Sequence, residues 1–135
     1  MENKKIFLLV EDDPIIQRVH RAFLEKMGFQ VELAATGAQA LEMFKSRAYH
    51  LIILDGGLPD MQGVEVGRKI RSLERENKTT RKPILLLSAY TSELLKRWCK
   101  EAEIDSFLIK PVDYKDLLFT LENYFSKGIF SDRAA

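Results

Sequence analysis

The sequence has few of the residues that cross-link small secreted proteins, and it lacks segments that could cross a membrane. Its 135 residues include one cysteine, Cys99, so no internal disulfide can form, and a reducing compartment is favoured. The longest apolar runs, such as residues 84–87, are far too short to span a bilayer. No charged leader followed by an apolar segment opens the chain. We therefore expect a cytoplasmic protein without a membrane partner.

Neither sign of charge dominates. The chain has 21 lysines and arginines against 20 acids, a net charge of +1, so nucleic acid is not expected as a direct partner. Hydrophobic residues make up 46% and charged residues 30%, a balance typical of globular domains and not of disordered chains. The length fits one domain with one core. We expect this domain at residues 1–127 and a short, loose tail at residues 128–135.

Short apolar runs alternate with stretches of helical period along the chain. The runs at residues 6–10, 51–54 and 84–87 are nearly continuous in apolar residues, as in strands buried on both faces. Residues 30–34 alternate between polar and apolar, which indicates an edge strand, and residues 106–109 complete the set. Helices are expected between the runs, at about residues 37–46, 64–77, 92–102 and 114–125, besides one that follows Pro14. This alternation predicts an α/β fold in which helices cover both faces of a five-stranded parallel sheet.

The first helix has clear signals at both ends. Asp13 is a good cap before Pro14, and Gly28 suits the left-handed residue that ends a helix. Its expected apolar stripe is Ile15, Val19, Ala22, Phe23, Leu24 and Met27. His20 has no acid or cysteine at a metal-binding spacing, so we expect a surface histidine or one with its hydrogen bonds satisfied.

Polar and charged side chains follow four of the five expected strands, at the edge where open parallel sheets bind ligands. They are Glu11, Asp12 and Asp13 after the first strand, Asp55 after the third, Ser88 after the fourth, and Lys110 before Pro111 after the fifth. Acids this close repel one another unless a cation neutralises them, and oxygen ligands favour Mg²⁺. A carboxylate nucleophile beside a divalent cation, with a lysine and a hydroxyl, suits an acyl-phosphate intermediate.

Each of these residues also has a simpler interpretation. Asp13 is more readily explained as a helix cap, and Asp55 could form a turn with Gly56 and Gly57. Lys110 could be a solvated lysine, and Ser88 an ordinary hydroxyl at the end of a strand. Only the combination of these residues indicates a site.

The combination resembles the response-regulator receiver domain of two-component signalling over roughly residues 5–126. The matching segments are LLVEDDP (8–14), ILD (53–55), LPDMQG (58–63), LSA (87–89) and FLIKP (107–111). The resemblance implies a flavodoxin-like sheet with strand order 2-1-3-4-5, a receiver domain at residues 1–127, and Mg²⁺ as cofactor. It also implies a phosphoprotein that takes its phosphoryl group from the phosphohistidine of a histidine kinase or a histidine phosphotransfer protein.

The resemblance assigns roles to individual residues. Asp55 would be the phosphoacceptor, and Ser88 and Lys110 would contact the phosphoryl oxygens. The Mg²⁺ ligands would be Glu11, Asp12, Asp55 and the main-chain carbonyl of Gly57. Ser88 and Phe107 would form the switch, and Pro111 would follow a cis peptide bond.

The sequence departs from the usual receiver pattern in several places. Glu11 stands where Asp is commoner, Ser88 replaces Thr, and Phe107 lacks the hydroxyl of the usual Tyr. Glu103 stands where many receivers have a helix-ending glycine, so we expect that helix to end differently. Leu94 and Trp98 share one face of the fourth helix, either as part of the core rim or as part of a partner surface.

Two settings for the domain remain open, and other classes of protein fit less well. The chain could be a stand-alone regulator or part of a hybrid histidine kinase. The charged stretch 71–82 slightly favours the hybrid kinase. Its output would pass to a downstream protein or a homodimer through the face of the fourth helix, fifth strand and fifth helix. The isolated domain would not be an enzyme acting on others, although it would catalyse its own phosphorylation and dephosphorylation.

The main alternative is a metal-dependent aspartyl-phosphate phosphatase, which usually has a second acid where this chain has Gly57. A flavin carrier would need a loop rich in Ser, Thr and Gly in place of the acids after the first strand. A pseudo-receiver would have lost one of the key residues.

Overall fold

The computed structural model describes residues 4–89 and 91–126, so the expected tail lies outside the described part. Strands and helices alternate along it. The strands are β1 (Ile6–Val10), β2 (Gln30–Ala34), β3 (Leu51–Asp55), β4 (Ile84–Ser88) and β5 (Ser106–Ile109). The helices are α1 (Pro14–Lys26), α2 (Gly37–Ser46), α3 (Gly63–Asn77), α4 (Glu93–Glu101) and α5 (Tyr114–Ser126). All strand pairs are parallel and the order is β2-β1-β3-β4-β5, which confirms the predicted fold.

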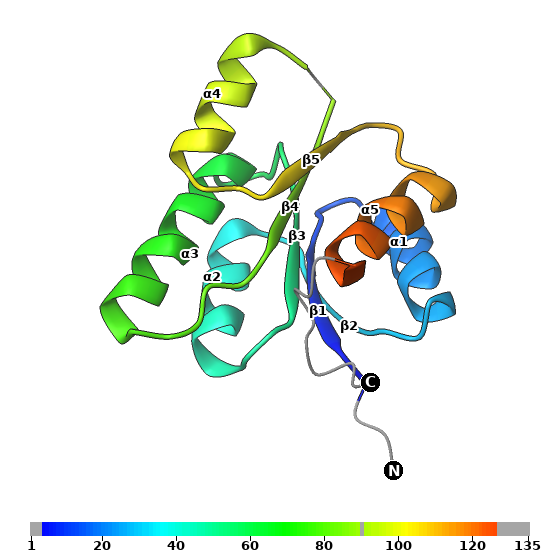
Figure 1. Cartoon of the computed structure of the whole chain (residues 1–135), viewed down its shortest axis with the longest axis horizontal. Coiled ribbons are helices and arrows are strands. Elements are labelled where there is room, and N and C mark those ends of the chain that lie inside the picture. Colours follow the sequence, from blue (N-terminus) through cyan, green and yellow to red (C-terminus); the bar gives the residue numbers. More distant parts are fainter. Residues whose placement is uncertain (1–3, 90, 127–135) are drawn as a thin grey trace.

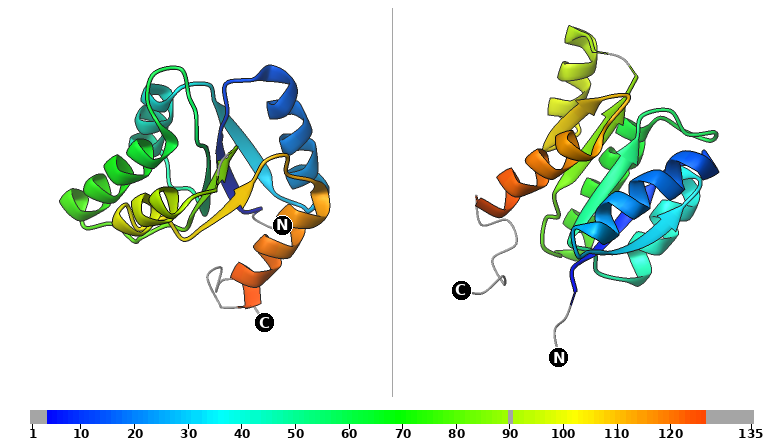
Figure 2. Two further views of the ribbon diagram at one scale, coloured as in Figure 1. Left: turned by 90° about the horizontal axis from the view of Figure 1, so that it is seen from above. Right: turned by 90° about the vertical axis from the view of Figure 1, so that its right-hand side faces the viewer.

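Two layers of helices cover the sheet (Figure 1). Helices α1 and α5 lie on one face, and α2, α3 and α4 lie on the other, as both views in Figure 2 also show. Each layer closes its own apolar cluster: Leu24 and Leu121 belong to the first, and Ile70 and Cys99 to the second. Cys99 is buried, as expected for a small apolar side chain. The two clusters hold the central strands rigidly between them.

Strands β3 and β4 each extend one residue further than the sequence predicted. Asp55 and Ser88 are therefore the last residues of fully buried strands. Asp55 is in register with Leu87, and Ser88 with Ile109. Ladder hydrogen bonds thus fix the backbone of both polar residues within the sheet.

Helix α1 begins and ends as predicted, but its buried face differs. Asp13 accepts hydrogen bonds from the backbone N–H groups of Ile15 and Ile16, and Gly28 has φ +99°. Ile15, however, is 70% exposed, and Val19 and Ala22 are also exposed. Of the expected apolar stripe, only Phe23, Leu24 and Met27 pack against the core.

His20 contradicts the sequence-based expectation. Its side chain is buried beside the ring of Phe23, at 5.9 Å between centroids, and its Nδ1 has no hydrogen-bond partner within residues 4–89 and 91–126. The helix turns His20 and Leu24 inward, which places Val19 and Ile15 outside. His20 is therefore neither a surface residue nor a satisfied one.

The end of α4 also differs from the prediction. Glu103 keeps the left-handed conformation, with φ 59°, although it is not glycine. Its carbonyl oxygen accepts hydrogen bonds from Arg71 Nη2 at 2.9 Å and Arg81 Nη2 at 3.1 Å. These charge-assisted bonds offset the roughly 1–2 kcal/mol cost of that conformation.

The structure identifies no membrane-crossing helix among residues 4–89 and 91–126: none is long and apolar enough.

Candidate functional site

Three carboxylates meet at the carboxyl ends of β1 and β3. Oxygens of Glu11, Asp12 and Asp55 all lie within 4.8 Å of one another. Glu11 and Asp55 are 2% and 3% exposed, whereas Asp12 is exposed. Two buried acids and one solvent-facing acid thus form a cluster that is open to the outside.

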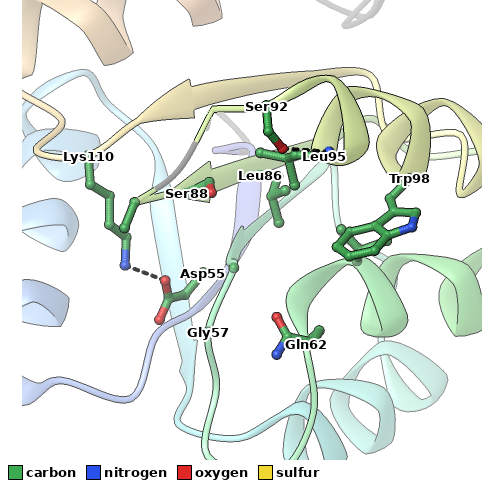
Figure 3. Close-up of a pocket in the computed structure, with 12 residues that line it drawn as sticks. Asp55, Gly57, Gln62, Leu86, Ser88, Ser92, Leu95, Trp98 and Lys110 are labelled. Atoms are coloured by element: carbon green, nitrogen blue, oxygen red, sulfur yellow. Dashed lines mark hydrogen bonds and ion pairs between the residues drawn. The ribbon is translucent and has the colours of Figure 1, made fainter.

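Lys110, which follows β5, reaches into this cluster. Its Nζ forms an ion pair and a hydrogen bond with Asp55 Oδ1, drawn as a dashed line in Figure 3, and lies 3.9 Å from Glu11 Oε1. The lysine therefore offsets part of the negative charge, and its head group lies beside the Asp55 carboxylate.

Glu11 shows most directly that the cluster lacks positive charge. Burial raises the pKa of Glu11 to about 7, a hydrogen bond from the Asp13 N–H opposes this shift, and the Asp55 charge adds to it. Glu11 Oε1 is buried and accepts no hydrogen bond from the residues that the structure describes. A buried carboxylate oxygen without a donor is costly unless a cation occupies the space before it. The oxygen donors of the cluster fit a hard divalent cation such as Mg²⁺.

The loop after Asp55 is a short closed turn. Gly63 N–H donates to the Gly56 carbonyl at 3.0 Å, and Gly57 and Gln62 form an isolated antiparallel bridge. Gly56 N–H donates to the Leu87 carbonyl at 2.7 Å. The backbone that carries the Gly57 carbonyl is therefore held at the base of the loop.

A cavity of about 580 Å³ extends from Asp55 toward α4. Ser88 and Lys110 line it on the β4 and β5 side, and Leu95 and Trp98 line it on the α4 side (Figure 3). Ser88 is buried, and its carbonyl accepts a hydrogen bond from Lys110 N–H at 2.7 Å. The cavity thus connects the acidic cluster with the exposed rim of α4.

The remaining candidate residues lie around this centre. Phe107 is half-buried against the apolar cluster beneath α3 and α4, and the Lys110–Pro111 peptide bond is cis. Asp13 caps α1 and does not belong to the group of three acids, as the simpler interpretation held. Gln17, for which the sequence carries no signal, donates from its side-chain amide in the first turn of α1 to the Glu11 carbonyl.

Comparisons with known proteins agree with this geometry. Residues 7–122 match the family model described as the response regulator receiver domain. This chain belongs to that family. In consequence, it is a receiver domain of two-component signalling, and the family generally works with Mg²⁺.

Individual relatives support the assignment. The aerobic respiration control sensor protein ArcB of Escherichia coli is 36% identical over 119 residues, which are 87% of this chain and 15% of ArcB. The chemotaxis protein CheY4 of Vibrio cholerae superimposes with a TM-score of 0.81 at 30% identity, covering 90% of this chain and 98% of CheY4. A third match is a co-crystal structure of the Saccharomyces cerevisiae histidine phosphotransfer protein Ypd1 with the receiver domain of Ssk1. It superimposes with a TM-score of 0.79 at 31% identity, covering 85% of this chain and 84% of that chain.

The receiver spans only a small part of several relatives. It covers 13%, 5% and 15% of the length of three curated ones, a fission yeast response regulator, a Dictyostelium hybrid histidine kinase and ArcB. Receivers of this type therefore occur as parts of much larger signalling proteins.

Proposed function

We propose that Asp55 accepts a phosphoryl group while Glu11, Asp12, Asp55 and the Gly57 carbonyl hold Mg²⁺. The observation that carries this proposal is the group of three acids within 4.8 Å, in contact with Lys110 and with one buried carboxylate oxygen lacking a donor. When bound, Mg²⁺ would supply the positive charge that the acids and the phosphoryl oxygens require. The same set of acids without a cation would repel an incoming phosphate.

The chain's own residues account for the transfer step. An Asp55 carboxylate oxygen attacks the phosphorus of a phosphohistidine, a P–O bond forms, and the P–N bond to the imidazole breaks. The imidazole nitrogen leaves with the electron pair of that bond. Lys110 exchanges its ion pair with Asp55 for one with a phosphoryl oxygen, and the Ser88 hydroxyl donates to another.

The phosphodonor would be a histidine kinase or a histidine phosphotransfer protein. The likeness to the Ssk1 receiver, which was crystallised with the phosphotransfer protein Ypd1, supports this partner. Val19 on α1 is exposed and lines, with His20, Lys110 and Pro111, a cavity of about 370 Å³. This cavity offers an apolar seat beside Lys110, which pairs with the phosphoacceptor.

The output surface would be the face made by α4, β5 and α5. Leu94 and Trp98 are 46% and 44% exposed, and Ile109 is exposed on β5, so large apolar groups are available to a downstream protein or a second copy. Of the two settings, the hybrid kinase is favoured by the similarity to the Dictyostelium hybrid signal transduction histidine kinase M, which is 33% identical over 117 residues.

The test is incubation with acetyl phosphate and Mg²⁺ followed by intact-mass measurement. The wild type should gain the mass of one phosphoryl group, and Asp55→Asn should gain none. Asp13→Asn is the matched control, because it changes an acid that caps α1 outside the cluster, and it should react like the wild type. Equal phosphorylation of Asp55→Asn and the wild type would show that the acceptor is another residue.

A further inference from the structure

The tip of the loop after Asp55 is attached to the N-terminus of α2 by one side chain. Asp60 Oδ1 accepts a hydrogen bond from Gly37 N–H at 2.8 Å, and Oδ2 accepts one from Ala38 N–H at 2.9 Å. These two donors hold the pKa of Asp60 below its usual range. Both carboxylate oxygens are thus engaged by the first turn of a helix that lies 22 and 23 residues earlier in the chain.

The backbone of Gly37 packs tightly against side chains of the loop and of α3. A Cβ on Gly37 would lie 2.6 Å from Met61 Cγ and 2.9 Å from Val66 Cγ2, so α2 can approach the loop and α3 only because residue 37 is glycine. Figure 1 shows α2 and α3 side by side on the same face of the sheet. Asp60 and its neighbour Met61 therefore form a built junction between the loop and α2.

Gly57 lies between this junction and the fixed base of the loop. The base is closed by the hydrogen bond from Gly63 N–H to the Gly56 carbonyl, and the bridge between Gly57 and Gln62 lies next to it. Because Asp60 anchors the tip as well, the loop is restrained at its base and at its tip. Loosening the tip would release the bridge that sets the position of Gly57.

The segment between β2 and α2 also contacts the other half of the acidic cluster. Glu11 N–H donates to the Ala34 carbonyl at 2.9 Å, at the end of β2. Three residues later, Gly37 begins α2 and donates to Asp60. This short segment therefore links the Glu11 half of the cluster with the loop that follows Asp55.

We propose that Asp60 is a positioning residue for Mg²⁺, because its two hydrogen bonds to α2 hold the Asp55–Gly57 half of the site in register with the Glu11–Asp12 half. The inference rests on the proposed metal site. Asp60 is not itself a ligand: it lies outside the group of acids that could share an ion in the described part of the chain. Partners that hydrogen-bond to metal ligands are worth about 10-fold or more in metal affinity, and we expect a similar loss when the loop that carries the Gly57 carbonyl is released.

If Asp60 only caps α2, its removal should lower stability without lowering Mg²⁺ affinity. Thr36, which caps the same helix, provides a matched control. Thr36 Oγ1 accepts a hydrogen bond from Gln39 N–H at 3.0 Å and so caps the same helix, but it does not contact the loop after Asp55 through any hydrogen bond that the structure records. Asp60→Ala and Thr36→Ala each remove capping bonds from α2. Only the first also releases the loop.

The experiment measures urea unfolding of the wild type and both variants over a series of Mg²⁺ concentrations, from which linkage gives the dissociation constant. Without Mg²⁺, both variants should be less stable than the wild type. Asp60→Ala should weaken Mg²⁺ binding about 10-fold. Thr36→Ala should leave it unchanged. Asp60→Asn retains one acceptor oxygen and most of the volume, so its Mg²⁺ affinity should fall between those of Asp60→Ala and the wild type.

The outcomes distinguish the positioning role of Asp60 from the existence of the Mg²⁺ site. Wild-type affinity in both Asp60 variants would overturn the positioning role, and so would equal weakening in Asp60→Ala and Thr36→Ala, which would assign the effect to α2 alone. A wild type whose stability does not depend on Mg²⁺ would overturn the metal site itself. Titration calorimetry with Mg²⁺ on the folded Asp60→Asn protein gives the same constant without unfolding.

Discussion

Gly63 begins α3 where the helix passes directly against the proposed phosphoacceptor. A Cβ at this position would lie 2.3 Å from the Asp55 carbonyl oxygen and 2.9 Å from Leu86 Cδ1, neither of which can move away easily. We expect Gly63→Ala to lower the free energy of unfolding by about 1–3 kcal/mol in urea unfolding. Gly57→Ala is the control, because a Cβ there meets nothing within 4 Å, and it should change stability by less than about 0.5 kcal/mol. Similar losses in both variants would contradict this account.

His20 gives the domain a pH dependence that can be tested. Burial lowers the pKa of His20, the Lys110 charge lowers it further, and Asp55 opposes both. Since the ordinary value is 6.5, the unfolded chain binds a proton at His20 before the folded protein does, and the contribution of His20 to the unfolding free energy falls as pH drops below about 6.5. Glu11, with its pKa raised to about 7, acts in the opposite direction over the same range. In unfolding curves measured from about pH 5 to about pH 8, the stability of His20→Leu relative to the wild type should therefore increase as pH drops. Identical pH slopes in the variant and the wild type would show that His20 titrates equally in both states.

At the scale of elements, Arg71 connects α3 with two loops. Its guanidinium donates to Glu74 Oε1 and the Lys82 carbonyl, both at 2.8 Å, and to Asp105 Oδ2 at 3.0 Å, besides the Glu103 carbonyl. The side chain is 2% exposed. The sequence presented this region only as a charged stretch, since nothing in residues 71–82 indicates which arginine is buried. Its partners near residue 103 are brought close by tertiary structure.

Removing Arg71 should therefore lower the unfolding free energy far more than removing another arginine of α3 that pairs with a glutamate three residues away. Arg71→Ala leaves Glu74 and Asp105 without their buried partner and should lower the unfolding free energy by roughly 3–5 kcal/mol. The control Arg68→Ala removes an exposed pair with Glu65 on the same helix, which is worth less than about 1 kcal/mol. The measurement is urea unfolding at constant pH and salt. A loss for Arg71→Ala no larger than that for Arg68→Ala would show that the network is not stabilising.

The elements themselves were largely predictable from the sequence, and the reasons are physical. Strands buried on both faces leave continuous apolar runs, and caps such as Asp13 and Gly28 act within a few residues of their own position. The helix faces were less predictable. The α1 stripe failed at Ile15 and Val19 because a surface apolar residue has the same sequence signature as a buried one.

At the scale of the molecule, the acidic cluster was predictable because parallel strands end at a common edge. Its supporting contacts were not. The attachment of Asp60 to Gly37 and the burial of His20 depend on which surfaces meet after folding, and neither follows a sequence period. The sequence thus indicated the chemistry of the site, and only the structure indicates what holds it in place.

The same whole-molecule view shows how α4 would respond to phosphorylation. At its C-terminal end, the helix leads into Glu103, whose carbonyl is held by Arg71 and Arg81, and Ile104 N–H donates back to the Cys99 carbonyl at 2.8 Å. At its N-terminal end, the side-chain hydrogen bonds recorded for the described residues are the Ser92 cap on Leu95 N–H and the exposed pair of Lys96 with Glu93. A dianion on Asp55 would draw the Ser88 hydroxyl inward and pull the segment that leads to Ser92. The N-terminal end of α4 should therefore move while the C-terminal end acts as a pivot.

This expectation can be tested with beryllofluoride and Mg²⁺, which mimic the phosphorylated state. Amide chemical shifts should change most from Ser92 to Leu95 and least from Cys99 to Asp105, and the fluorescence of Trp98, the one tryptophan in the chain, should change because its ring lines the cavity that reaches Asp55. Asp55→Asn given the same additions should show neither change. Shift changes of equal size along α4 would refute the pivot. Changes confined to Glu11, Asp12 and the loop after Asp55 would show that the signal does not reach α4, because in that case the two ends of the cavity would be uncoupled.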